Sequence, residues 1–172
     1  MGRNSVKKNK SIYQIRREEL KLSREKASEI LGSITPERIE KIENEKSAAH
    51  PDEILEMSNG YKMPQLCNYY CANECPIGQE YVPEVTMKDL SQIVLEMIAS
   101  LNSVNKNQER FIEIVADGEI SKDEMKDFVQ IQRELEKISI TVETLQLWVE
   151  QMIDNNKFDI ELYKKFANQF EQ

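Results

Sequence analysis

The sequence predicts an all-α protein with an N-terminal domain of four to five short helices and a long C-terminal antiparallel helical hairpin that resembles a coiled-coil bundle. Only five Gly and five Pro occur among the 172 residues. Apolar residues recur with helical spacing, and residues that cap helices stand at the breaks between these segments. With 40% apolar and 31% charged residues, the composition is that of a folded globular protein.

The N-terminal part divides into a basic arm and a helical domain. Residues 1–10 are polar and basic without apolar periodicity, which predicts a flexible arm. Four helices are expected between residues 11 and 62, with Ser23 and Thr35–Pro36 starting the second and third. Their predicted inward residues are Ile12, Ile15 and Leu20, then Ala27, Ile30 and Leu31, then Ile39 and Ile42, and finally Ile54, Leu55 and Ser58.

Residues 63–85 are predicted to be a connector with one short helix, and they contain all three cysteines. Cys67, Cys71 and Cys75 are spaced four residues apart, which places them near one face of a helix, although Pro76 favours the helix end for Cys75. Such thiols could bind zinc or an iron–sulfur cluster, with His50 as a fourth zinc ligand. They could also form a redox switch or simply pack as small apolar residues.

Residues 86–172 are predicted to form the hairpin and to dimerise. Two heptad seams alternate steps of three and four residues, which is the pattern of helices that pack along their length. The first is Leu90, Val94, Met97, Leu101, Val104, Gln108, Phe111 and Val115, and the second is Phe128, Ile131, Leu135, Ile138, Val142, Leu145, Val149 and Met152. A last short helix shows Phe158, Leu162, Phe166 and Phe170 at a spacing of four.

The net charge of −8 conceals a division along the chain. Residues 1–62 carry a net charge of +2 and residues 63–172 one of −10, while residues 1–26 alone carry +6. An acidic protein can therefore still present a basic face to phosphate. In the arm, Arg3, Lys7, Lys8 and Lys10 could follow a DNA backbone or form a solvated tail.

Other features exclude several classes of protein. The N-terminus lacks the apolar core of a signal peptide, and no apolar run approaches the roughly 20 residues of a membrane span. We therefore expect a cytoplasmic protein without membrane association. The single His excludes most His-based acid–base catalysis, and no Gly-rich phosphate loop occurs. The sequence does not predict an enzyme.

Between Ser11 and Tyr61 the sequence resembles the lambda-repressor-like (Cro/cI, XRE) helix-turn-helix family. The resemblance rests on Leu22–Ser23, Glu25–Lys26–Ala27, Thr35, Ile42–Glu43–Asn44–Glu45–Lys46, Pro51 and Ile54–Leu55. It implies a DNA-binding domain whose third helix enters the major groove. The DNA-binding residues expected from it are Ser23, Arg24, Thr35, Glu37, Arg38 and Lys41.

Two departures from the family pattern affect the expected interface. Glu45 stands where the family has Gly after the recognition helix, and the turn between the second and third helices is about one residue longer. The outer face of the recognition helix is also expected to be more acidic than usual, with Glu37, Glu40 and Glu43. Glutamate can read a cytosine amino group, but it also repels phosphate. The fold could therefore also serve to bind protein.

The resemblance and the heptads together predict a sequence-specific transcriptional regulator that binds double-stranded DNA as a homodimer through residues 86–172. Two alternatives remain. One is a metal- or redox-sensing regulator that uses Cys67, Cys71 and Cys75. The other is a helical scaffold or antitoxin-like protein that does not bind DNA.

Overall fold

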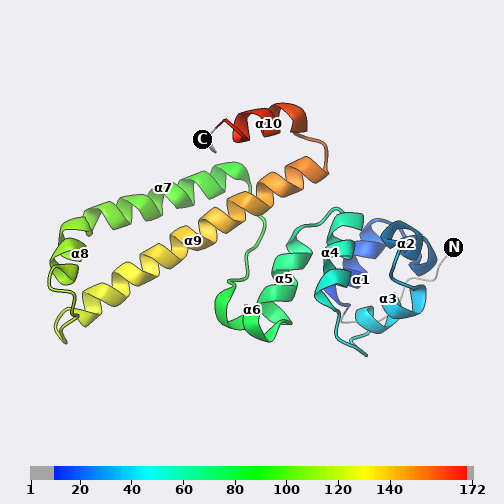
Figure 1. Cartoon of the computed structure of the whole chain (residues 1–172), viewed down its shortest axis with the longest axis horizontal. Helices are drawn as coiled ribbons and strands as arrows, with labels where there is room; N and C mark the ends of the chain where they lie inside the picture. The colour runs from blue at the N-terminus through cyan, green and yellow to red at the C-terminus, as the bar shows by residue number, and fades with distance from the viewer. Residues whose placement is uncertain (1–9, 170–172) are drawn as a thin grey trace. The chain divides into compact units, whose positions relative to one another are not determined.

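A computed structural model of the chain describes residues 10–169 and contains, within this range, ten helices and no strand (Figure 1). The predicted all-α class is confirmed. The helices belong to two compact units, one made of residues 10–84 with residues 150–169 and the other of residues 85–149. A search of the described helices found none with the length and apolar character of a membrane span. Most of the predicted basic arm, residues 1–9, lies outside the described residues.

The first unit begins with four helices at the predicted positions: α1 (Ile12–Glu19), α2 (Arg24–Leu31), α3 (Pro36–Glu43) and α4 (Pro51–Gly60). Ser11, Ser23 and Thr35 are the N-caps of α1, α2 and α3, and each side chain accepts a hydrogen bond from a backbone N–H in the first turn. These caps satisfy amide groups that have no partner inside the helix. The short polar side chains therefore fix where each helix begins.

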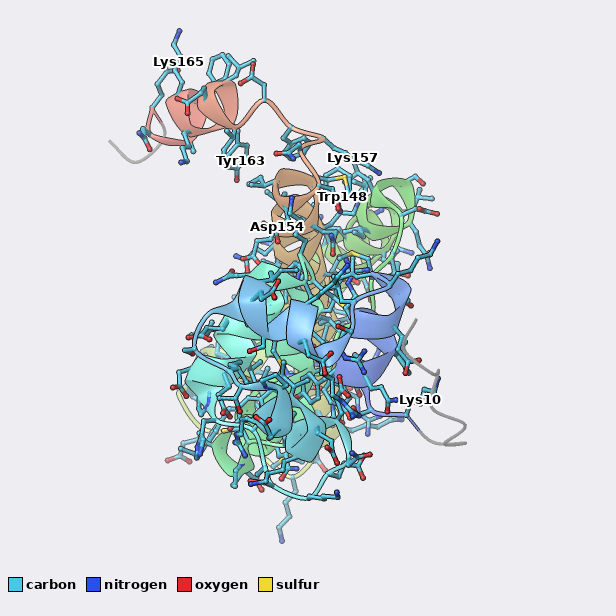
Figure 2. The ribbon with its side chains drawn as sticks, turned by 90° about the vertical axis from the view of Figure 1, so that its right-hand side faces the viewer. Lys10, Trp148, Asp154, Lys157, Tyr163 and Lys165 are labelled. Atoms are coloured by element: carbon cyan, nitrogen blue, oxygen red, sulfur yellow. The ribbon has the colours of Figure 1, made fainter. Side chains whose placement is uncertain are left out.

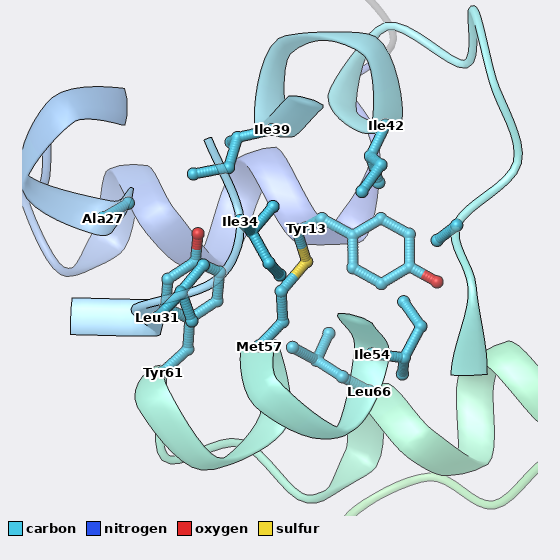
Figure 3. Close-up of a cluster of buried hydrophobic side chains, with 11 residues drawn as sticks. Tyr13, Ala27, Leu31, Ile34, Ile39, Ile42, Ile54, Met57, Tyr61 and Leu66 are labelled. Atoms are coloured by element: carbon cyan, nitrogen blue, oxygen red, sulfur yellow. The ribbon is translucent and has the colours of Figure 1, made fainter. Parts of the chain in front are cut away.

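The core of this unit is only partly the predicted one. Ala27, Leu31, Ile39, Ile42 and Ile54 are buried as predicted, and Tyr13, Met57, Tyr61 and Leu66 join them (Figure 3). Ser58 is also buried as predicted. The predictions for Ile15, Leu20, Ile30 and Leu55 are wrong, because these side chains are 37–56% exposed. In α1 the buried residues are Tyr13, Gln14 and Arg17. The inward face of α1 is thus partly polar, which apolar periodicity cannot reveal.

The predicted connector is instead two further helices of the same unit, α5 (Gln65–Asn73) and α6 (Pro76–Tyr81). Leu66 is fully buried in the core, so a boundary at residue 62 would divide the core. A Cβ atom on Gly78 would lie 2.0 Å from the carbonyl oxygen of Cys71, so only glycine permits this approach of α6 to α5. Such a close approach of two helix backbones depends on a single glycine, so the apolar pattern of the sequence does not reveal it.

The second unit contains α7 (Leu90–Lys106), α8 (Gln108–Val115) and the part of α9 (Met125–Asp154) up to residue 149. Figure 1 shows α7 and α9 running in opposite directions, as predicted for a hairpin. Asn107 separates α8 from α7. Arg110 of α8 forms an ion pair of 2.8 Å with Asp127 of α9.

At five buried positions the buried face differs from the predicted seam by one residue, whereas Ile131 is buried on the seam as predicted. The buried residues are Ile93, Ser100, Ile114, Ile131, Thr141 and Thr144. In contrast, Leu90, Val94, Leu101 and Val115 of the first predicted seam are 40–49% exposed. The broad apolar stripes therefore cannot all be covered by one partner helix. Each helix of the hairpin therefore keeps an apolar flank exposed, which a second protein chain could cover.

The chain closes with α10 (Ile160–Ala167), which begins at the N-cap Asp159. The rings of Phe158 and Tyr163 stack with their centroids 6.0 Å apart. Figure 2 shows Tyr163 and Lys165 pointing to opposite sides of α10. The short amphipathic helix predicted here is present, although its expected residue Phe170 lies outside the described residues.

Candidate nucleic-acid interface

The candidate interface is built on α2, α3 and the turn that joins them. Gly32 ends α2 with a φ of +79°, a left-handed conformation that costs glycine little. Ile34 is then buried and anchors the turn, and the Thr35 hydroxyl accepts a hydrogen bond of 3.3 Å from the Arg38 amide. Pro36 at the first helical position is compatible with this cap. The first turn of α3 is therefore held in a defined orientation.

Ile39 and Ile42 fix the inward face of α3, and both are almost completely buried. Glu37 and Lys41 lie on the exposed side of the same helix. Neither side chain forms an ion pair or hydrogen bond with another described residue. Of the six DNA-binding residues expected from the sequence, these two are the charged ones that remain free for a ligand.

Arg38 is exposed in part, but its guanidinium group is engaged within the domain. It donates hydrogen bonds of 2.6 Å to both carboxylate oxygens of Glu53, and others to Ser47 Oγ at 2.7 Å and the Ala48 carbonyl at 2.8 Å. The same carboxylate accepts the backbone N–H of His50 at 2.7 Å. Arg38 thus joins α3 to the loop before α4, and a DNA contact would have to compete with its four hydrogen bonds.

Arg24 is likewise paired, because its Nε donates a hydrogen bond of 2.9 Å to Glu43. The remaining two expected residues, Ser23 and Thr35, act as helix caps, and Thr35 is also exposed. All six residues therefore lie on α2, α3 or their caps. The structure separates them into two free charges, two paired arginines and two caps.

The expected acidic outer face needs a correction at Glu43. This side chain is 0% exposed and accepts hydrogen bonds from Arg17 of α1 and Arg24 of α2. It belongs to the inward stripe because it follows Ile39 by four residues on α3, a spacing that could have indicated burial. Glu40 forms an ion pair of 3.2 Å with Lys46, which lowers the pKa of the Glu40 carboxyl. Among the described residues, Glu37 is therefore the one carboxylate on the exposed side of α3 that forms no ion pair.

Sequence reasoning did not identify the two polar networks that hold this region. Glu53 lies in the first turn of α4, three residues after the N-cap His50, and the hydrogen bond from Arg38 lowers the pKa of its carboxyl. Arg17 approaches Glu43 from α1. In both networks the paired arginine and glutamate are 15 or more positions apart in the sequence, so no local motif predicts the pairing.

The three cysteines lie in α5 and at the start of α6 and are free thiols. Cys67 packs against the core, and Cys75 is the N-cap of α6. Burial raises the pKa of the Cys71 thiol, and the neighbouring Cys75 and Cys67 raise it further. Between residues 10 and 169 no group of three or more His, Cys, Asp or Glu side chains is placed to hold a metal ion. His50, the suggested fourth ligand, is instead the N-cap of α4.

Residues 12–64, which run from the start of α1 to the residue before α5, match a family model described as Helix-turn-helix. Searches of curated proteins and of solved structures found no match to the chain.

Proposed function

Since residues 12–64 are a helix-turn-helix domain of the Cro/cI (XRE) type, we propose that this protein is a sequence-specific transcriptional regulator that binds double-stranded DNA as a homodimer. The family itself is a DNA-binding, regulatory one. The observation that carries the proposal is the exposed side of α3, where Glu37 and Lys41 are free while Arg38 and Glu43 are held inside the domain. An exposed, rigid helix with free polar side chains near its N-terminus is what major-groove recognition requires.

The two free side chains differ in what they can read. The Glu37 carboxylate can only accept hydrogen bonds, so among base edges in the major groove it fits the amino group of cytosine. The Lys41 ammonium can only donate, so it fits guanine or a backbone phosphate. Thr35, exposed at the N-cap, adds a short polar group at the same end of the helix. We propose that these three residues make the contacts of α3 with DNA.

The dimer part of the proposal rests on the apolar flank of the hairpin, defined as Leu90, Val94 and Leu101 of α7 with Leu135 and Val142 of α9. These side chains are 40–46% exposed. They repeat at heptad spacing on each helix. Burying the part of each side chain that is still exposed would contribute less than half of the about 1.5–3 kcal/mol gained when such a side chain is buried completely. A second copy offers the same flank, so two hairpins would form a four-helix bundle with twofold symmetry.

Such a dimer predicts the form of the DNA site. A twofold protein binds two half-sites related by the same symmetry, about 34 Å apart when they face successive major grooves. The acidic second unit would be held away from phosphate by the repulsion between like charges.

Selection of bound fragments from random double-stranded DNA, followed by salt titration of the best site, tests the proposal. A regulator of this kind is expected to select an inverted repeat, and log K should fall linearly with log salt concentration. If the full chain binds no DNA at about 50 mM salt, the proposed function is wrong. If it binds a single asymmetric half-site, the dimer part is wrong.

A further inference from the structure

The second unit has a groove along one flank of α9 and the turn before it, which we name the basic groove. It has a volume of about 840 Å³ and is lined by Lys122, Met125, Lys126, Val129, Gln130, Arg133, Glu134 and Lys137. Four of these eight side chains are cationic, although residues 63–172 as a whole carry a net charge of −10. A local concentration of positive charge on an acidic surface selects for acidic partners.

Most of these cations are not used within the chain. Lys137 forms an ion pair of 2.8 Å with Glu134, the one carboxylate of the groove. Lys122, Lys126 and Arg133 form no ion pair with any residue of the described range 10–169. An acidic ligand could therefore pair with these three cations without displacing an ion pair within the described residues.

Two apolar side chains, Met125 and Val129, also line the groove, and we call them its apolar floor. Met125 is 48% and Val129 is 37% exposed, and the two side chains lie one helical turn apart on the same flank as the cations. Lys126 and Lys137 are separated by eleven residues, or roughly 16 Å along the helix axis. Two neighbouring apolar side chains together with cations spread over this length match the chemistry of a helix that lies alongside α9.

The basic groove faces away from the apolar flank that we assign to the dimer. Leu135 lies two positions from Arg133 and two from Lys137, and two residues correspond to about 200° of rotation around a helix. A second copy seated on Leu135 and Val142 would therefore leave the groove open. The two surfaces also differ in charge, because the dimer flank consists of Leu and Val residues whereas the basic groove contains four cations.

We propose that the basic groove is a docking site for an acidic amphipathic helix of another protein. Its apolar side chains would cover Met125 and Val129, and its carboxylates would pair with Lys126, Arg133 and Lys122. The apolar floor favours a helix over a nucleic-acid backbone, since a chain of phosphates gains nothing from methionine and valine. The helix would belong to a protein partner of the proposed regulator, and its binding to the groove does not depend on DNA binding.

Fluorescence anisotropy with the full chain tests this proposal. The probe is a labelled helical peptide of about four turns with leucine and glutamate on one face, and the comparison peptide has the same composition in an order that separates them. The designed peptide is expected to bind at least about tenfold more tightly than the scrambled one, a difference of about 1.4 kcal/mol. Equal binding of both peptides, or no binding, would overturn the proposal.

Variants locate the binding site. The double charge reversal Lys126→Glu with Arg133→Glu is expected to weaken peptide binding at least about tenfold. The matched change Lys106→Glu, on the exposed surface of α7, should leave it unchanged. Met125→Ser should weaken binding about threefold, because the apolar floor is reduced while every cation is kept. If Lys106→Glu weakens binding as much as the double variant, general charge attraction explains it and the proposal fails.

Other occupants are distinguished by the same variants. In sedimentation equilibrium, the double variant should have the same oligomeric state as the unaltered chain. If the double variant dissociates into monomers, the groove is a contact between copies of this chain instead. A single-stranded oligonucleotide or vesicles with anionic lipid should bind no better to the unaltered chain than to the double variant. Stronger binding of either to the unaltered groove than that of the designed peptide would contradict an acidic helix as its occupant.

Discussion

The guanidinium group of Arg17, from α1, donates two hydrogen bonds to the carboxylate of Glu43, from α3, in the interior of the N-terminal unit. The two side chains are 9% and 1% exposed. Arg24 of α2 donates to the same carboxylate at 2.9 Å, and the Arg17 Nη1 also reaches the Leu22 carbonyl at 2.7 Å. One buried carboxylate therefore joins the three helices on which the proposed DNA interface depends. Because both arginines are bound to it, its loss would leave buried charge without a partner.

Replacing Glu43 with glutamine should lower the free energy of unfolding by about 3 kcal/mol, because removing one member of a buried ion pair leaves the other uncompensated. Urea unfolding followed by circular dichroism measures the change. Glu29→Gln removes an exposed carboxylate from α2 and should change stability by less than about 0.5 kcal/mol. Similar losses in both variants would show that the Arg17–Glu43 pair has no special role.

Glu45 adopts a φ of +56°, in the left-handed region that non-glycine residues seldom occupy. It stands where the family pattern has Gly. Replacement with glycine should therefore raise the free energy of unfolding by up to about 1 kcal/mol, as backbone strain is relieved and partly offset by the entropy of the unfolded glycine. Glu45→Ala is the control, since it removes the carboxylate but keeps Cβ. A gain in the alanine variant equal to that in glycine would assign the effect to charge.

The pair of Arg38 and Glu53 predicts a loss of stability in acid. Hydrogen bonding to Arg38 is the main cause that lowers the pKa of Glu53 in the folded state. A carboxyl with a lowered pKa stabilises the fold at a pH above its unfolded value, about 4.3, and this contribution disappears as the pH falls through the folded pKa.

Glu53→Gln should consequently cost about 1 kcal/mol at pH 7 and make stability depend less on pH below about pH 5. Urea unfolding at several values between pH 7 and pH 3 measures this difference, with Glu29→Gln as the control. An unchanged pH dependence in Glu53→Gln would show that Glu53 contributes nothing to acid sensitivity. Glu18, whose pKa is lowered mainly by hydrogen bonding to Lys10, remains to give the residual slope.

Glu37 and Lys41 are expected to contribute to DNA binding in different ways. Glu37→Gln should change the preferred base at one position of each half-site from cytosine to adenine, because glutamine can donate as well as accept. Lys41→Ala should weaken binding by about 1–3 kcal/mol if Lys41 contacts guanine, or reduce the salt slope by about one if it contacts phosphate. Selection of bound DNA by each variant separates these results. An unchanged site preference in Glu37→Gln would remove Glu37 from base recognition.

Leu101→Glu should convert the proposed dimer to a monomer, because it places a charge in the apolar flank of α7, where Leu101 is now 46% exposed. The control Ala99→Glu lies two positions away, about 200° around the helix, and should remain dimeric. Sedimentation equilibrium gives the mass of each variant, and circular dichroism confirms that the helices are retained. A chain that is already monomeric before substitution would contradict the dimer at once.

The sequence by itself determined the class of the fold and the positions of the first four helices. The caps Ser23 and Thr35 act on neighbouring residues, so their effect can be predicted from spacing alone. The buried pair Ile39 and Ile42 followed from the same local periodicity. The resemblance in residues 11–61 agrees with the family match for the same reason, since it rests on local pattern.

The tertiary structure decided which polar side chains remain free. Glu43 and Arg38 are charged residues on the recognition helix, and local sequence suggested that both face a ligand. Their partners, Arg17 and Glu53, come from other helices, and the sequence does not state which helices meet. A hydrogen bond between distant residues depends on the packing of the whole domain, whereas a helix cap depends on three or four neighbours. For that reason the candidate interface, for which the sequence suggested six residues, consists of the three exposed residues Thr35, Glu37 and Lys41 in the structure.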